Sequence, residues 1–433
     1  MKIRTLFLAS LALCAMASCS KDDGVSTPQD VDAYLSIAAN SVVQTKASTA
    51  GTDDVGTGNE AVVNTLTAYV FSADGNYVIR KKVTAGDDDA ITEDKSINGA
   101  TVKSITAIKG IHVKVTKPAT DGTASATTFK VYLIANTDPG TAATIDAFKA
   151  LLTETITNYP TVGASSLPMH SEELNVSSIF PSSETNHVLN WYKNGGCTQN
   201  TVSLTGTTAA AIDKAATAPT DLTTVVMTRA ISRVQIESLS ASFSGQYASA
   251  TFTIDSIYVA NVRNNATVMG IENPSASYFR GAPSAFTVIQ NLIEPTGSTN
   301  SMFLKVYTSV SPALSLASGG TLSSTQLGFR SYINANIPTP KIVGTASIAY
   351  STRLIISGNF KVGGVIRHKY FHIPLVDTDA SKNVLSNKIY KITATITGEG
   401  NDNPDEILDN ACINFKISVA DWNVVNQSEG DLN

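Results

Sequence analysis

A cysteine near the start of the chain, Cys19, has the surroundings of an acylation site. Two small residues, Ala17 and Ser18, precede it, and before them come a short positive head and an almost wholly apolar run at residues 6–16. This order is typical of a secretory signal peptide over residues 1–18. The alternative is a signal peptide followed by a chance cysteine. The apolar run is about half as long as a bilayer span, so we expect an exported precursor that is held at the membrane by lipid on Cys19.

Two histidines suggest a metal site, but their spacing argues against one. His368 and His372 lie four residues apart in a pattern that predicts a strand, which puts their Cα atoms roughly 13 Å apart. Two side chains at that distance do not share one zinc ion, whereas the same spacing on a helix would allow it. We therefore predict exposed strand histidines that bind no metal.

Two acidic stretches, residues 87–94 and 401–406, have side chains that calcium prefers. Neither has the ligand spacing and central glycine of an EF-hand loop, so solvated loops are the preferred interpretation and calcium binding stays open. The sequence contains no nucleophile elbow, phosphate loop or dinucleotide fingerprint. We accordingly predict no catalytic residue, no cofactor-binding residue and no metal ligand, and a protein that is not an enzyme.

The composition is poor in charged residues. Asp, Glu, Lys and Arg make up 15% of the 433 residues, against about 25% in ordinary soluble domains. The formal net charge of −5 and the lack of a basic patch argue against a nucleic-acid partner. Cys197 and Cys412 are the cysteines that remain beyond the leader and Cys19. Whether they form a disulfide stays open.

Strands dominate the predicted elements, because β-branched residues are abundant and fit a pleated sheet. Residues 34–43 alternate and predict a strand, which follows a polar tether at residues 22–31 and precedes an exposed loop at residues 45–60. One face of this strand carries Leu35, Ile37, Ala39, Ser41 and Val43.

Further strands and one helix follow along the chain. The predicted strands are residues 65–72, 131–135, 225–236, 250–260, 302–308, 351–360, 365–375 and 388–397. A short helix is predicted at residues 144–153, where Ile145, Phe148, Leu151 and Leu152 share a face. A polar stretch at residues 214–224 precedes the strand at 225–236, so we place the domain boundary there.

The C-terminal segment carries a long strand that is apolar on one side. Its apolar residues fall in two alternating phases: Ile413, Phe415, Ile417 and Val419, and then Trp422 and Val424. The slip between the phases predicts a bulge or a break, so that the final segment pairs independently of the strand before it. Such a strand is an aggregation hazard unless it is paired. It either folds into its own sandwich or completes the sheet of another subunit by strand addition.

Several passages together resemble the Bacteroidales fimbrillins, the subunits of long and short fimbriae. In chain order they are residues 66–71 (LTAYVF), 131–137 (VYLIANT), 167–172 (LPMHSE), 228–234 (TRAISRV), 396–404 (ITGEGNDNP) and 419–422 (VADW). Each motif alone is weak, but their order and spacing extend over nearly the whole chain. The resemblance implies an all-β fold of two tandem transthyretin-like β-sandwich domains, with a short helix in the N-terminal half.

The resemblance also implies a division of the chain and a mechanism of assembly. The divisions are a signal peptide (1–18), a lipid-anchored propeptide with a removable strand (19–46), an N-terminal β-sandwich (47–223) and a C-terminal β-sandwich with a terminal donor strand (224–433). A trypsin-like surface protease would cut between Lys46 and Ala47 and open a groove. The donor strand of another copy would then fill the groove. Family members usually present Arg at the cut, so Lys46 leaves the identity of the protease open.

The expected product is the stalk subunit of a cell-surface fimbria, whose precursor is an outer-membrane lipoprotein and which supports adhesion and biofilm. Its partners would be other copies, other fimbrial subunits, the protease, the membrane through its lipid, and receptors on host or bacterial surfaces. Two alternatives stay open: an anchor or tip subunit of the same fimbria, and a surface glycan-binding lipoprotein. The latter needs an exposed aromatic platform, and the chain has only two tryptophans, Trp191 and Trp422. For Trp191 core packing is preferred.

Overall fold

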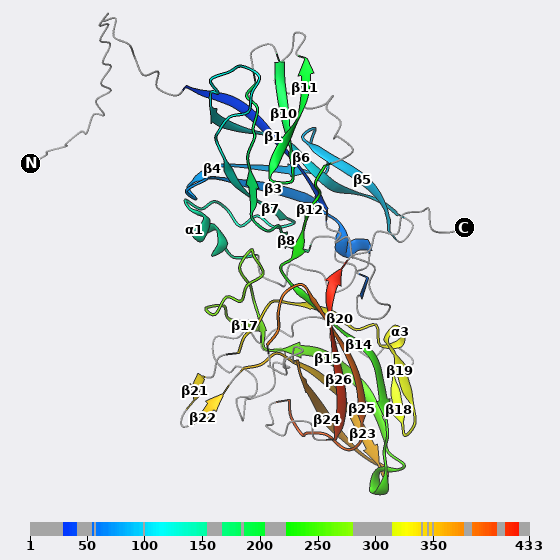
Figure 1. Cartoon of the computed structure of the whole chain (residues 1–433). Helices are drawn as coiled ribbons and strands as arrows, with labels where there is room; N and C mark the ends of the chain where they lie inside the picture. The colour runs from blue at the N-terminus through cyan, green and yellow to red at the C-terminus, as the bar shows by residue number, and fades with distance from the viewer. Residues whose placement is uncertain are drawn as a thin grey trace, which may run out of the picture.

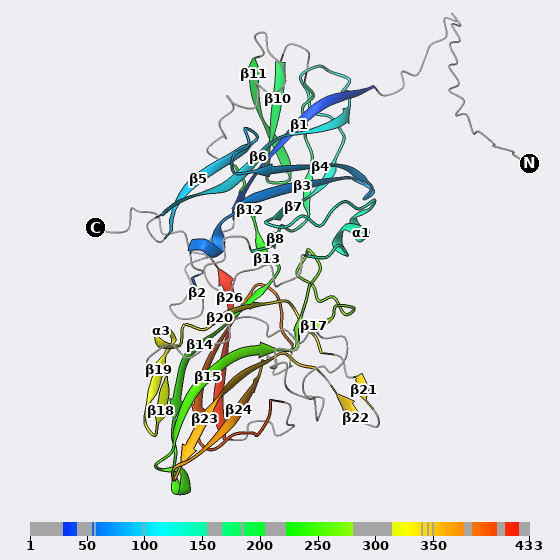
Figure 2. The same ribbon diagram turned by 180° about the vertical axis from the view of Figure 1, so that it is seen from behind.

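The computed structural model is almost entirely β and has two lobes, one above the other in Figure 1 and Figure 2. It describes residues 29–40, 54–55, 58–97, 100–153, 167–182, 186–203, 222–279, 314–338, 341–343, 346–348, 350–375, 383–404 and 412–423. Each lobe encloses an apolar core between two sheets, so the predicted all-β fold of two β-sandwich domains is confirmed. Among the described residues, no helix has the length and apolar character needed to cross a bilayer.

The first sheet of the N-terminal lobe has the strand order β11-β10-β1-β6-β5. Its strands are β1 (Asp30–Asn40), β5 (Ala90–Ile97), β6 (Ala100–Thr116), β10 (Asn186–Lys193) and β11 (Gly196–Ser203), and the short β12 (Val225–Val226) pairs with the end of β1. The first of these strands in the sequence therefore lies in the middle of the sheet, between two strands that come later.

The second sheet of this lobe has the order β13-β8-β7-β3-β4, and β9 pairs with β7. Its strands are β3 (Thr65–Ser72), β4 (Tyr77–Thr84), β7 (Phe129–Ala135), β8 (Met169–His170), β9 (Leu174–Val176) and β13 (Thr228–Arg229). Its core-facing residues include Leu66 and Val131, which pack in one cluster with Leu35 and Ile37 of the first sheet.

The C-terminal lobe is built from the sheets β19-β14-β25-β26-β2 and β18-β15-β23-β24, with β20 paired to β14. The strands are β2 (Asp54–Val55), β14 (Ser232–Ala241), β15 (Thr251–Ala260), β18 (Ser315–Ala317), β19 (Thr321–Ser323), β20 (Arg330–Ile333), β23 (Arg353–Val362), β24 (Val365–Pro374), β25 (Lys388–Ile396) and β26 (Ile413–Asn423). Two small sheets complete it: β16 (Val262–Arg263) with β17 (Tyr278–Phe279), and β21 (Lys341–Val343) with β22 (Ala346–Ile348). In Figure 1, β26 points from the far end of this lobe toward the N-terminal lobe.

The described helices are all short: α1 (Ile145–Lys149), α3 (Ser324–Leu327) and the 3₁₀ turns η1 (Gly58–Ala61) and η3 (Gly245–Tyr247). The predicted helix at residues 144–153 is present as α1 but ends at Lys149. The chain beyond it pairs with the C-terminal lobe, because the Leu151 carbonyl accepts a hydrogen bond from the Val268 amide at 2.8 Å. Leu152 is 41% exposed, so its assignment to the buried helix face is wrong.

The predicted strands differ from the observed ones where the chain changes partner. The strand predicted at residues 34–43 begins at Asp30, so the end of the predicted tether belongs to β1. The single strand predicted at residues 225–236 is wrong: the chain forms β12, β13 and β14 there. These pieces pair in turn with β1, with β8, and with β20 and β25, since the chain is crossing from one lobe to the other. The strand predicted at residues 302–308 lies outside the described residues.

Replacing Ile37 with Ala in the full-length protein should lower the free energy of unfolding of the N-terminal lobe by roughly 2–5 kcal/mol. Ile37 is fully buried between the two sheets, so truncation leaves a cavity in the core. Calorimetric melting measures the change. Val365→Ala is the control, because Val365 is 51% exposed and its loss should cost less than about 0.5 kcal/mol. Equal effects of the two changes would contradict the core position of β1.

Candidate assembly site

β1 is paired along both of its edges. On one edge it runs antiparallel to β6, from Asp30 opposite Thr116 to Ala38 opposite Ala107. On the other edge it runs parallel to β10 at residues 34–36 and to β12 at residues 39–40. A strand in this position satisfies the backbone groups of its neighbours on both sides. Its removal would leave two unpaired edges within one sheet.

Both faces of β1 are covered as well. Ala33, Leu35, Ile37 and Ala39 point into the sandwich core, which confirms the predicted alternation as far as Ala39. The residues that pack around the opposite face are Tyr34, Ala38, Ala107, Leu189 and Trp191. The Ser36 hydroxyl on that face accepts a hydrogen bond from the Gly110 amide at 3.2 Å. Removal of β1 would therefore expose apolar surface on two sides.

Four predicted site residues, Cys19, Lys46, Ala47 and Val424, lie outside the described residues, as do Ser41 and Val43 of the predicted strand. The described residues on either side of the predicted cut are held by different parts of the molecule. β1 ends at Asn40 within the N-terminal sheet, and β2 begins at Asp54 beside the C-terminal strand. A cut between these two strands would separate β1 from the rest of the chain.

The C-terminal strand β26 lies in the chain's own C-terminal lobe. It pairs antiparallel with β25, from Ile413 opposite Ile396 to Asp421 opposite Lys388. Among the described residues, its other edge pairs only with β2, at the last two residues of β26. Over most of its length β26 is therefore an edge strand. The predicted donor residues Phe415, Ile417 and Val419 are half-buried against the core, and Ile413 is buried. Donation to a second copy stays a prediction.

The predicted bulge or break in this strand is wrong. The register between β25 and β26 continues without a shift through the point where the apolar phase slips. The phase changes because different parts of the molecule cover the two faces of β26. The core of the C-terminal lobe lies against Ile413, Phe415, Ile417 and Val419, whereas Trp422, on the opposite face, packs with Leu167, Ile231 and Tyr332 where the lobes meet. Up to Trp422 the segment is thus an integral part of its own lobe.

Trp422 is held by one aromatic ring and two arginines. Its ring stacks on Tyr332, with the ring centroids 5.8 Å apart and the planes 4° from parallel. The guanidinium carbons of Arg229 and Arg233 lie 4.7 Å and 5.3 Å from a ring centroid of Trp422. Arg229 Nη1 also donates a hydrogen bond to the Trp422 carbonyl at 3.2 Å. Cation–π contacts gain strength when they are shielded from water, and Trp422 is 1% exposed.

A buried carboxylate, Glu60 of η1, completes this cluster. The carboxylate accepts hydrogen bonds from Arg233 Nη1 and from the Tyr332 hydroxyl, each at 2.6 Å, and the Glu60 carbonyl accepts one from Arg229 Nη2 at 3.0 Å. Burial lowers the pKa of Arg229 to about 10, and the charge of Glu60 opposes that shift. Burial, reinforced by Glu60, raises the pKa of Tyr332. We refer to Glu60, Arg229, Arg233, Tyr332 and Trp422 together as the tryptophan clamp.

The sequence indicates only part of the tryptophan clamp. Trp422 is predicted as an apolar residue of the donor strand, and Arg229 and Arg233 lie in a passage that carries the family resemblance. Glu60 is predicted to lie in an exposed loop, which is wrong because it is fully buried. No local pattern marks Glu60 or Tyr332, since their burial depends on residues far away in the sequence: Glu60 and Arg233 are 173 positions apart.

The histidines of β24 differ in their surroundings. His368 is partly exposed and pairs with Asp255. His372 is only 2% exposed, so its predicted exposure is wrong. The segment around Asn401 covers this part of β24, and the Asn401 side chain lies 3.2 Å from His372 Nδ1.

The remaining candidate residues are occupied in other ways. Asp89 pairs with Lys81 and Asp402 with Lys369, at 2.6 Å and 2.5 Å. Across the described ranges, which leave out Asp405 and Glu406, no three His, Cys, Asp or Glu side chains come together to hold a metal ion. Cys197 and Cys412 are free thiols that pack against the cores of different lobes. Trp191 is fully buried and forms no surface platform.

Comparison with known proteins identifies the N-terminal lobe. Residues 33–224 match the family model of the major fimbrial subunit protein (FimA). This match begins within β1 and ends just before β12. No curated protein sequence matches the chain.

Solved structures share the two-lobed fold. A proposed cell adhesion protein from Parabacteroides distasonis ATCC 8503 is 15% identical, with a TM-score of 0.59 over 91% of this chain and 100% of that one. A second proposed cell adhesion protein from the same strain is 18% identical, with a TM-score of 0.55 over 92% of this chain and 99% of its own. A fimbrilin (FimA) from Porphyromonas gingivalis W83 is 16% identical, with a TM-score of 0.50 over 91% and 99% of the two chains.

At these identities the structural likeness establishes the fold alone, and the family match is confined to residues 33–224. The resemblance to fimbrillins is thereby confirmed, and the chain carries, at residues 33–224, the domain of the major fimbrial subunit (FimA) family.

Proposed function

We propose that this chain is the stalk subunit of a cell-surface fimbria and that it polymerises by donor-strand exchange. Proteolysis after Lys46 removes β1, and the C-terminal strand of another copy takes its place. The observation that carries the proposal is the position of β1, which is the first described strand yet is central in its sheet and covered on both faces. The FimA match at residues 33–224 supports the fimbrial part of the proposal.

Loss of β1 would leave a groove that favours another strand. The edges of β6 and β10 lose their partner, and each backbone group left buried without a hydrogen bond costs about 1–3 kcal/mol. The apolar side chains around Leu35 and Ile37 meet water at a cost of about 25 cal/mol per Å². An extended segment with alternating apolar residues removes both costs by strand addition.

β26 has the properties of a strand that gains by moving into such a groove. In the part of its own lobe that the structure describes, it pairs along its length with β25 and, at its end, with β2. In the place of β1 it would pair on both edges, and each added ladder hydrogen bond contributes roughly 0.5–1.5 kcal/mol net. Its half-buried residues Phe415, Ile417 and Val419 would also become more fully covered.

The proposal assigns the rest of the chain as follows. Residues 1–18 are the signal peptide, residues 19–46 the propeptide acylated at Cys19, and residues 47–223 and 224–433 the two domains of the mature subunit. The precursor is an outer-membrane lipoprotein, a trypsin-like surface protease matures it, and the fimbria supports adhesion and biofilm. The first residue of the surface-assembled protein separates the main alternatives: Ala47 indicates a stalk subunit, and Cys19 an anchor subunit.

Replacing Lys46 with Ala should block maturation and polymerisation while export continues. Lys46 is the only Lys or Arg between β1 and β3, so its loss removes the tryptic site that frees the strand. Surface protein run on a non-boiled gel should show high-mass ladders for the wild type and a monomer for the variant. Lys46→Arg, which keeps a basic residue at the cut, should restore the ladders. Ladders from Lys46→Ala would overturn the stalk role or move the cut to Arg80 or beyond.

Replacing Cys19 with Ala should abolish acylation and surface delivery, because Cys19 alone of the two leader cysteines follows two small residues. Metabolic labelling with a fatty acid measures the change. Cys14→Ala is the control and should keep the label. Label that persists in Cys19→Ala, or that disappears only in Cys14→Ala, would refute the assignment.

Replacing Trp422 with Ala should lower the free energy of unfolding of the uncut precursor by roughly 3–5 kcal/mol, since Trp422 is fully buried in the tryptophan clamp. Thermal melting measures the loss. The control is Lys416→Ala on the exposed side of the same strand, which should change stability by less than about 0.5 kcal/mol. An unchanged melting temperature for Trp422→Ala would show that β26 is not anchored in its own lobe.

A further inference from the structure

We propose that the tryptophan clamp is a latch that sets how readily β26 leaves its own sheet for another copy. This inference rests on the donor role of β26 proposed above and adds residues that control it. Glu60, Arg229, Arg233 and Tyr332 are then positioning residues for the donor strand. Arg229, Arg233 and Tyr332 contact this strand at Trp422, near its C-terminal end. Glu60 acts through them, because it binds all three.

The latch adds to a strand that β25 holds along one edge. β26 is an edge strand with half-buried apolar side chains over its middle portion. Trp422 is the largest of its described side chains that are buried, and it is 1% exposed. Large aromatic side chains bury the most area and dominate the energetics of such contacts. Release of β26 from its own lobe therefore depends on release of Trp422.

The charges of the clamp explain why an aromatic ring belongs there. Two guanidinium groups, of Arg229 and Arg233, share the buried site with the carboxylate of Glu60. The negative face of the Trp422 ring attracts both guanidinium groups, and the Trp422 carbonyl accepts a hydrogen bond from Arg229. Withdrawal of Trp422 would leave a buried cation without these partners, which is costly. The Glu60 carboxylate holds Arg233 and Tyr332 against the ring through its hydrogen bonds to both. Loss of its charge should therefore loosen the grip on Trp422 and weaken the latch.

Proteolysis does not by itself open the latch. All five clamp residues follow Ala47 in the sequence, so a cut after Lys46 removes none of them. The cut would open the groove of one copy and leave its own donor strand in place. β26 would then leave its own sheet only when the open groove of another copy is available to receive it. This requirement limits pairing of β26 with the strand edges of unrelated proteins.

The test is Glu60→Gln in the full-length protein. Glutamine keeps the shape of the side chain but removes the charge that neutralises the arginines. Hydrogen–deuterium exchange of the uncut monomer should become roughly tenfold faster or more over residues 413–423, because local opening controls exchange in such a segment. Strands β23 and β24 of the same lobe should exchange at an unchanged rate.

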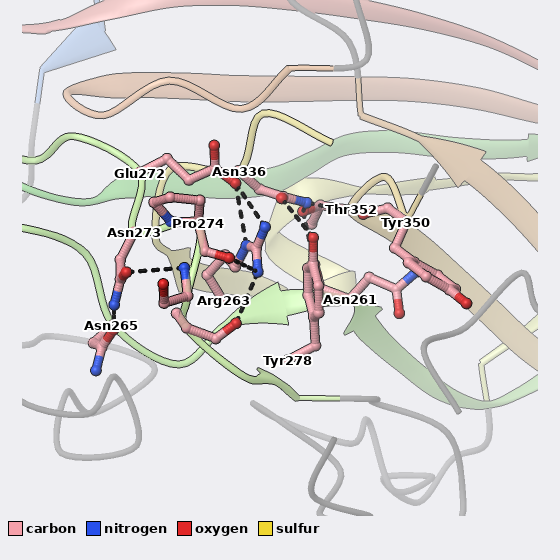
Figure 3. A network of polar contacts seen from close by, with 12 residues as sticks. Asn261, Arg263, Asn265, Glu272, Asn273, Pro274, Tyr278, Asn336, Tyr350 and Thr352 are labelled. Atoms are coloured by element: carbon pink, nitrogen blue, oxygen red, sulfur yellow. Dashed lines mark hydrogen bonds and ion pairs between the residues drawn. The ribbon is translucent and has the colours of Figure 1, made fainter. Parts of the chain in front are cut away.

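A second buried pair in the same lobe provides a matched control. Figure 3 shows Arg263 between Glu272 and Tyr278, in an arrangement that resembles the clamp. Arg263 Nη2 lies 2.8 Å from the Glu272 carboxylate, and its guanidinium carbon lies 4.0 Å from the Tyr278 ring centroid. Glu272→Gln makes the same chemical change as Glu60→Gln within a network of residues 261–278 and 334–352. It should lower overall stability without speeding exchange in β26.

The outcomes separate the latch from the proposed function. Equal exchange over residues 413–423 in the wild type and Glu60→Gln, or equal acceleration in both glutamine variants, would overturn the latch. Faster exchange in Glu60→Gln with faster ladder formation after cleavage would support both proposals. Faster exchange without any polymer in the wild type or the variant would keep the latch and overturn donor-strand assembly. If Glu60→Gln does not fold, Tyr332→Phe replaces it in the same measurements. This change removes one hydrogen bond to Glu60 and keeps the stacked ring.

Discussion

The structure depends on a simple constraint: backbone groups inside a sheet must be hydrogen-bonded. In the N-terminal lobe that requirement falls on β1, which bridges β6 to β10 and β12. Without it the sheet would divide into two pieces that share no ladder. β1 nevertheless comes first among the described strands of the lobe, and the strands that flank it follow much later in the chain. In the exchange that we propose, a strand of another copy takes this central place, so that the sheet stays in one piece.

The C-terminal strand has the opposite character. β26 is bonded on one side over most of its length, and its apolar face is only partly covered. The difference between a doubly paired and a singly paired strand gives a direction to exchange, because hydrogen bonds and buried area both increase toward the central position. The donor role remains our proposal, and this asymmetry is its physical basis.

The tryptophan clamp joins the two lobes through residues that are distant in sequence. The passage at residues 228–234 and the passage at residues 419–422, which both carry the family resemblance, meet there. Arg229 and Arg233 of the first passage contact Trp422 of the second, and Glu60 balances their charge. The two motifs therefore belong to one packing arrangement, which accounts for their presence in the same chain. The FimA match covers only residues 33–224, so this arrangement extends beyond the matched domain.

The sequence by itself determined the class of the fold and most of its strands, because alternation and β-branched residues act locally. The alternation of Leu35, Ile37 and Ala39 predicted the core-facing side of β1 correctly, and the order of several weak motifs indicated the fimbrillin family. The candidate site was predictable only in outline: the strand that became β1 and the position of Trp422 in the C-terminal strand were apparent, whereas Glu60 and Tyr332 carried no local signal. The tertiary structure alone decided which surface covers each face. It buried His372 beneath the segment around Asn401. It also covered the core-facing side of β26 and the opposite side at Trp422 with different partners, so the slip in the apolar pattern needs no bulge. Burial depends on what packs against a residue from elsewhere in the chain, and no local pattern contains that information.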